Sequence, residues 1–123
     1  MILDAGFLIS VDRGERSARR VLELLADGAI VRTTEPVVAQ TWRDGGRQAR
    51  LAGALAGMEV HPFVDGRAVG RLLRSSGTSD VVDAHLVLLA AQVGEPIITG
   101  DPDDLRRIAS AFGGHAPTIH AWP

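Results

Sequence analysis

Short apolar segments alternate with helical patterns along the whole chain, and this alternation restricts the fold most strongly. The strand-like segments lie at residues 1–3, 29–31, 59–63, 97–98 and 118–120, and residues with apolar side chains at helical spacing lie between them. This order is typical of an α/β protein in which parallel strands form a sheet and helices cover both of its faces. We therefore expect a three-layer α/β sandwich with a mainly parallel central sheet.

Several of the expected helices carry start and stop signals. Thr34 is placed to cap a helix that has Pro36 in its first turn, and Ser79 is placed to cap the longest helix, which continues to Val93 and ends at Gly94. The other helical patterns cover residues 15–27, 47–55, 65–73 and 101–111, with a brief helix near residues 6–9.

Length and composition predict one domain over residues 1–123, because 123 residues with a hydrophobic fraction of 46% can form one substantial core. The chain contains no cysteine, which excludes disulfide scaffolds, zinc–thiolate sites and thiol nucleophiles. We find no secretory signal pattern, and the longest apolar run, residues 84–93, is too short to span a bilayer. These features predict a cytoplasmic protein that does not enter the membrane.

The charge of the chain does not decide between nucleic acid and other partners. The formal net charge is −2, and all 13 basic residues are Arg, a side chain suited to phosphate or carboxylate. Arg67, Arg71 and Arg74 share one helix face, where they either contact RNA phosphates or form a solvated surface, and we favour the solvated surface.

Aspartates at the ends of expected strands are the candidate functional residues. Asp4 follows the first strand and Asp101 the fourth, and the carboxyl ends of strands in such sheets are where functional groups gather. Asp83 interrupts an apolar helix, with Asp80 one turn earlier on the same side. Each of these carboxylates could also serve only as a helix cap or first-turn charge, but capping and metal binding are compatible.

Carboxylates that converge in this way predict a cation site. Three of them repel one another, so without a cation at least one would hold its proton. Ligand sets made only of oxygen select hard ions, here Mg²⁺ or Mn²⁺ rather than zinc. Such an ion supports phosphoryl chemistry by lowering the pKa of a bound water.

Three motifs lie in a characteristic order along the chain: residues 1–4 (Met-Ile-Leu-Asp), residues 83–91, and residues 96–101 followed by Asp104-Leu105. Together they resemble the PIN-domain family, in particular the VapC-type toxins of bacterial type II toxin–antitoxin pairs, over essentially the whole chain. The resemblance implies a Mg²⁺-dependent endoribonuclease that hydrolyses RNA, an antitoxin that blocks its site, and a homodimer. It implies that the catalytic and metal-binding residues are Asp4, Asp83 and Asp101, with supporting roles for Asp80, Asp104, Gln40 and Thr99.

The chain departs from the family pattern at two places. Gln40 stands where the family usually has a Glu, and an amide binds a cation less strongly than a carboxylate; Ala5-Gly6 stands where hydroxyl side chains are common. An alternative function is therefore a catalytically weakened PIN-like module that acts by binding RNA or a partner. A phospho-accepting receiver domain ranks last, because that class needs a Lys near its site and this chain has none.

Overall fold

The computed structural model describes residues 1–122, which form a sheet of five strands in the order β3-β2-β1-β4-β5. All four strand pairings are parallel, so the α/β sandwich expected from the sequence is confirmed. The strands are β1 (Ile2–Leu3), β2 (Arg32–Thr34), β3 (Glu59–His61), β4 (Ile97–Thr99) and β5 (Ile119–Ala121).

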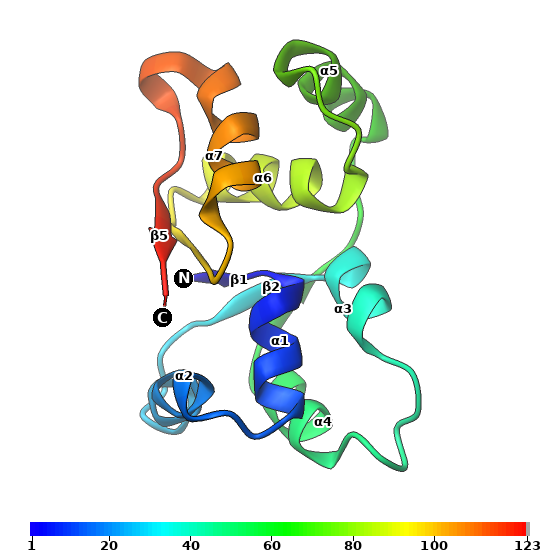
Figure 1. Ribbon diagram of the computed structural model, residues 1–123, viewed down its shortest axis with the longest axis vertical. Helices are drawn as coiled ribbons and strands as arrows, with labels where there is room; N and C mark the ends of the chain where they lie inside the picture. Colours follow the sequence, from blue (N-terminus) through cyan, green and yellow to red (C-terminus); the bar gives the residue numbers. More distant parts are fainter. Residues whose placement is uncertain (123) are drawn as a thin grey trace.

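Helices cover both faces of this sheet and complete the three layers (Figure 1). One layer holds α1 (Ala5–Asp12), α2 (Arg16–Ala26), α3 (Glu35–Thr41) and α4 (Ala49–Ala56). The opposite layer holds α5 (Gly66–Ser76), α6 (Val81–Val93) and α7 (Pro102–Ala109), after which a 3₁₀ helix, η1 (Ser110–His115), leads to β5. Among residues 1–122, no helix combines the length and apolar character that crossing a membrane requires.

The core lies on both faces of β1 and β4, which explains why β1 and the first two residues of β4 are apolar. Ile2, Leu3 and Ile97 are fully buried between the layers. α6 packs at the centre of its layer and buries six of its residues, so it reads as an apolar run rather than an amphipathic pattern. Asp83 lies in the first turn of this buried helix, and its position there is set by the packing of the apolar residues that follow.

The structure corrects several boundaries predicted from the sequence; the third strand, for example, ends at His61 rather than at residue 63, and α5 continues to Ser76. The second strand is residues 32–34 rather than 29–31, because pairing with β1 begins at Arg32; Ile30 is 57% exposed. The cap of α6 is Asp80 rather than Ser79, since the Asp80 side chain accepts a bond from the amide of Asp83 (2.9 Å). The helix predicted to run to residue 111 ends its α-helical part at Ala109.

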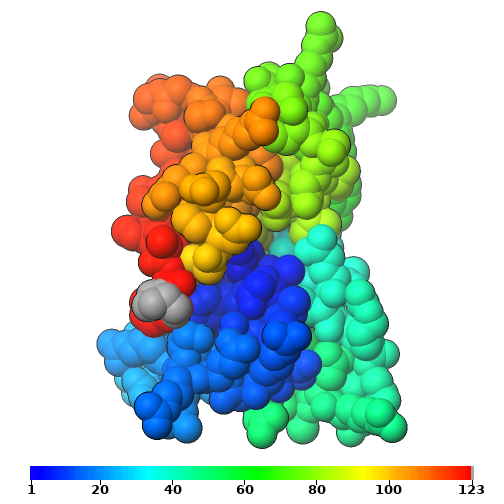
Figure 2. All heavy atoms as spheres, in the orientation of Figure 1, coloured from blue at the N-terminus to red at the C-terminus, as the bar shows by residue number. Residues whose placement is uncertain are grey.

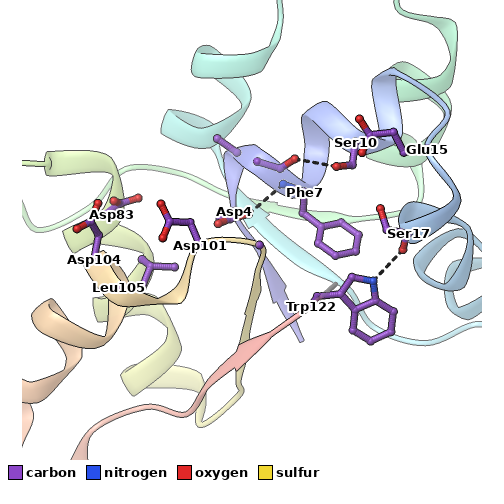
Figure 3. A pocket seen from close by; sticks show the side chains of 13 residues that line it. Asp4, Phe7, Ser10, Glu15, Ser17, Asp83, Asp101, Asp104, Leu105 and Trp122 are labelled. Atoms are coloured by element: carbon purple, nitrogen blue, oxygen red, sulfur yellow. Dashed lines mark hydrogen bonds between the residues drawn. The ribbon is translucent and has the colours of Figure 1, made fainter.

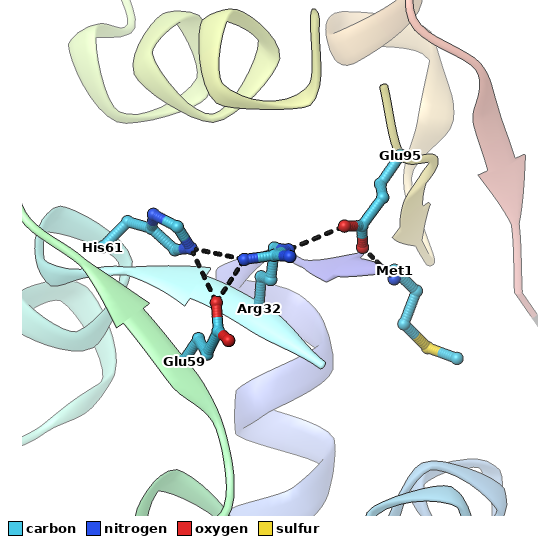
Figure 4. A network of polar contacts seen from close by, with 5 residues as sticks. All are labelled: Met1, Arg32, Glu59, His61 and Glu95. Carbon is cyan, nitrogen blue, oxygen red and sulfur yellow. Dashed lines mark hydrogen bonds and ion pairs between the residues drawn. The ribbon is translucent and has the colours of Figure 1, made fainter. Parts of the chain in front are cut away.

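A network of polar side chains, mostly at or next to the amino ends of the strands, joins four strands of the sheet (Figure 4). Arg32 Nε donates to Glu95 (2.7 Å), and a second guanidinium nitrogen of Arg32 pairs with Glu59 and lies 3.1 Å from His61 Nε2. Burial alone would raise the pKa of Glu95, but the bonds from the amino group of Met1 and from Arg32 outweigh it and lower the pKa. This network links β1, β2 and β3 to the start of β4.

Candidate active site

The sheet has its switch point between β1 and β4, the place where chain order reverses and where open α/β sheets form ligand sites. Asp4 directly follows β1, and one residue, Gly100, separates Asp101 from the end of β4. The pairing of Leu3 with Ile98 places Asp4 beside Thr99 in the neighbouring strand. The parallel topology therefore brings two of the predicted residues to one edge, as the sequence indicated.

A cavity of about 400 Å³ opens at this edge. Four of the predicted residues line it: Asp4, Asp83, Asp101 and Asp104. Figure 3 shows Asp101 between Asp4 and the pair formed by Asp83 and Asp104. On the surface, the N-terminal segment (blue) and the β4–α7 segment (yellow to orange) meet on one face (Figure 2).

Asp4 is held in one orientation by hydrogen bonds to both of its carboxylate oxygens. Thr99 Oγ1 donates to Oδ2 (2.5 Å), and the amide of Phe7 donates to Oδ1 (3.0 Å) in the first turn of α1. Thr99 Oγ1 also accepts a bond from the amide of Asp101 (3.0 Å). The buried Thr99 hydroxyl thus connects the two strand ends that carry Asp4 and Asp101.

Asp101 keeps its carboxylate available. It occupies the position before α7 with Pro102 at the first helical position, the arrangement that predicts a capping Asp. Its side chain makes no capping hydrogen bond in the structure, and it is exposed at the cavity. The interpretation of Asp101 as only a helix cap therefore has no support from the geometry.

The electrostatics of the cavity favour protonation or a bound cation. Burial raises the pKa of Asp83 to about 6, and the charges of Asp80, Asp4, Asp104 and Asp101 add to the rise. Burial also raises the pKa of Asp4, which the bonds from Thr99 and Phe7 oppose and the charge of Asp101 reinforces. The repulsion expected from convergent carboxylates is thus present at the two least exposed members of the group.

Three predicted supporting residues do not line this cavity: Thr99, which bonds Asp4, and also Asp80 and Gln40. Asp80 caps α6 and borders a neighbouring hollow that it shares with Asp83 and Asp104. Gln40 is exposed on α3 and is not among the residues that line the cavity. The supporting role predicted for Gln40 stays a prediction.

Other residues of the cavity were not singled out from the sequence. Its far wall holds Phe7, Ser10, Glu15, Ser17 and Trp122. Glu15 precedes α2 in the chain, so the sequence alone indicated a helix start and nothing more. Trp122 reaches the cavity because β5 runs beside β4, a pairing that the sequence did not specify.

The donor chemistry of the cavity fits a hard divalent cation. All of its charged groups are carboxylates, the ligands that Mg²⁺ and Mn²⁺ prefer. Within residues 1–122, no three His, Cys, Asp or Glu side chains are close enough together to enclose a metal ion. Mg²⁺ commonly binds through one or two carboxylates and retains several waters, so it does not need such a cage. The residues fit a hydrated ion held from one side.

Comparison with known proteins extends these observations to the fold. No protein-family model and no curated protein matches the sequence. Among solved structures, the chain resembles one in the crystal structure of VapBC2 from Rickettsia felis bound to a DNA fragment from the promoter of these proteins. The TM-score is 0.71 at 18% sequence identity, and the likeness covers 99% of this chain and 98% of that one. The PIN-like fold that the three motifs predicted is thereby confirmed.

Proposed function

We propose that this protein is a divalent-cation-dependent endoribonuclease that acts as the toxin of a type II toxin–antitoxin pair. The observation that supports this most is the cavity at the switch point of the sheet, where Asp4, Asp83 and Asp101 come together from three separate parts of the chain. The raised pKa values of Asp4 and Asp83 support a site that gains stability from a cation.

A Mg²⁺ or Mn²⁺ ion at the acidic end would be held by one or two of the carboxylates of Asp4, Asp83 and Asp101 and by waters that it retains. It would lower the pKa of a water and offset the negative charge of a phosphodiester. The protein's own contribution is orientation. Thr99 and the amide of Phe7 fix the Asp4 carboxylate while leaving it further lone pairs, and Thr99 also fixes the backbone at Asp101. Asp104, at the same cavity, adds negative charge that favours a cation.

Asp83 is the group most suited to exchange a proton when no cation is bound. Its pKa of about 6 means that near neutral pH a small fraction of the molecules still carries this proton. A cation that binds the ionised carboxylates displaces the proton, so binding of the cation becomes tighter as the pH rises through about 6.

The partners proposed for the chain follow from its PIN-like fold. The similar chain comes from VapBC2, which was crystallised on promoter DNA. We propose that the present chain pairs with an antitoxin protein, that it forms a homodimer, and that it acts on RNA in the cytoplasm. Co-expression with the product of the neighbouring gene, followed by gel filtration, tests both the pairing and the oligomeric state.

The test of the activity is cleavage of a 5′-labelled single-stranded RNA by the purified protein in Mg²⁺ and in EDTA. We expect cleavage only with the cation, products with 5′-phosphate and 3′-hydroxyl ends, and loss of cleavage in Asp4→Asn and Asp101→Asn. The control is Asp103→Asn, an exposed residue in the first turn of α7 that does not line the cavity.

Equal cleavage by the unaltered protein and both cavity variants would refute the proposal. The departure from the family pattern at Gln40 favours a second candidate, a weakened module that binds RNA without cutting it. RNA binding that persists without any uptake of Mg²⁺ or Mn²⁺ in calorimetry would support this second candidate instead.

A further inference from the structure

The cavity at the switch point has two chemically different ends. Figure 3 shows the carboxylates of Asp83, Asp101 and Asp104 on one side and the rings of Phe7 and Trp122 on the other, with Asp4 between them. The proposed function uses only the acidic end. The aromatic end is therefore the part of the same cavity that has no role so far.

The Trp122 ring is held firmly at this end. Its backbone amide donates to the carbonyl of Thr99 (2.8 Å), and its indole Nε1 donates to the carbonyl of Ser17 (2.9 Å). The ring meets Phe7 edge-on, with centroids 6.1 Å apart at 60°. Since Thr99 also binds Asp4, one residue fixes the spacing between the aromatic and acidic ends.

Trp122 offers a bound group the face of its ring for stacking rather than a free hydrogen-bond donor. Its indole N–H is already bonded to Ser17, and Phe7, which meets the ring edge-on, is buried. The Trp122 ring itself is partly exposed and lines the cavity. An immobile aromatic ring with exposed area, whose position is fixed before binding, loses little conformational entropy when a flat group stacks on it.

The charge of this end selects the kind of flat group. Glu15 lines it with a carboxylate that makes no capping bond to α2, and within residues 1–122 no Arg or His lines the cavity. A phosphate here would meet a negative charge without any cation. A neutral aromatic ring with N–H groups on its edge would meet acceptors at Glu15 and hydroxyls at Ser10 and Ser17.

We propose that the aromatic end binds one unpaired nucleobase, stacked on Trp122, of the RNA strand whose phosphate lies at the acidic end. The proposal rests on the proposed function for its substrate and deepens it by stating the form of that substrate. A base can stack on a protein ring only when it is released from its own helix, so the RNA recognised here is single-stranded at this position.

The test measures the coupling between the ring and the base. Short single-stranded RNAs with an abasic site at successive positions are titrated, in Ca²⁺, against the unaltered protein and against Trp122→Leu. Stacking of a base on an aromatic side chain corresponds to a change of about 5- to 150-fold in affinity. We expect the abasic site to weaken binding by this factor at one position, and Trp122→Leu to weaken intact RNA while removing the abasic effect.

Two controls separate stacking from a purely structural role. Trp122→Phe retains an aromatic face and should retain most of the abasic effect. Replacing the other tryptophan of the chain, Trp42→Leu, should leave the effect unchanged, because Trp42 lies at the end of α3 and does not line the cavity. If Trp122→Leu does not fold, Trp122 fluorescence in Trp42→Phe protein is measured instead; quenching by intact RNA, reduced by the abasic site, supports the proposal.

The outcomes distinguish this inference from the proposed function. If the protein cleaves RNA, but an abasic site weakens RNA binding equally in the unaltered protein and in Trp122→Leu, the base site alone is overturned. A coupled abasic effect without any cleavage overturns the nuclease but supports the base site. Absence of RNA binding, or fluorescence of Trp122 that saturating RNA does not change, overturns the base site in either case.

Discussion

Replacement of Asp83 by Asn is expected to stabilise the protein at neutral pH when divalent cations are absent. Burial, followed by the charges of neighbouring carboxylates, raises the pKa of Asp83 from 3.8 to about 6. A carboxyl group with a raised pKa in the folded state favours folding most below pH 3.8. That contribution is lost as the pH rises through about 6. Above this pH the ionised carboxylate opposes folding, and an amide of the same shape does not.

The size of the effect follows from the pKa. A rise from 3.8 to about 6 corresponds to about 3 kcal/mol. Because Asp83 is only partly buried, solvent screening reduces the expected gain in the free energy of unfolding to about 1–2 kcal/mol. For a chain of this size, that gain corresponds to an increase of about 3–10 °C in Tm.

The assay is urea and thermal denaturation of both proteins in EDTA between pH 4 and pH 8. The difference in stability should be close to zero at pH 4 and should grow through pH 6. Asp103→Asn is the matched control, because it removes an exposed aspartate from the first turn of α7, where a negative charge is favourable. It should leave stability unchanged or slightly lower. If Asp83→Asn lowers the free energy of unfolding, and does so by the same amount at pH 7.5 as at pH 4, the electrostatic account is refuted.

Three further predictions concern other parts of the structure. Thr99→Val should lower the free energy of unfolding in urea by about 1–2 kcal/mol and weaken Mn²⁺ binding, because Asp4 loses its side-chain donor. The control is Thr33→Val: the Thr33 hydroxyl bonds a β1 carbonyl, so its loss should leave Mn²⁺ binding unchanged. Glu95→Gln should cost about 1–3 kcal/mol at pH 7, and less as the pH falls below about 4.5, because the pKa of Glu95 is lowered and its ionised form is the stabilising one. Gly94→Ala should lower the free energy of unfolding, measured in urea, by about 1 kcal/mol, because Gly94 ends α6 with a φ of +70°, which disfavours a residue with a Cβ.

The acidic end of the cavity could be predicted from the sequence because it depends on local patterns and on one topological rule. Asp4 and Asp101 each follow a short apolar strand, and parallel strands bring their carboxyl ends to one edge. Asp83 was identified because a carboxylate in an apolar helix is costly. Each of these inferences needs the type of the element but not its precise boundaries.

The parts that could not be predicted depend on packing between distant segments. Residues 29–31 are apolar enough for a strand, but strand pairing places β2 at Arg32–Thr34 and leaves Ile30 exposed. The wall formed by Glu15 and Trp122 requires α2 and β5 to lie beside the same strand end, and no local pattern shows this. The sequence also could not show whether the Asp101 side chain caps α7.

The central claim is that the acidic end of the cavity, lined by Asp4, Asp83 and Asp101, binds a divalent cation at the switch point of the sheet. Anomalous diffraction from crystals soaked in Mn²⁺ tests it most directly, because the signal locates the ion independently of activity. The account predicts one strong peak at the acidic end of the cavity, in contact with the carboxylates of Asp4 and Asp101, and its loss in Asp4→Asn crystals. A peak elsewhere, or no peak at saturating Mn²⁺, would contradict it.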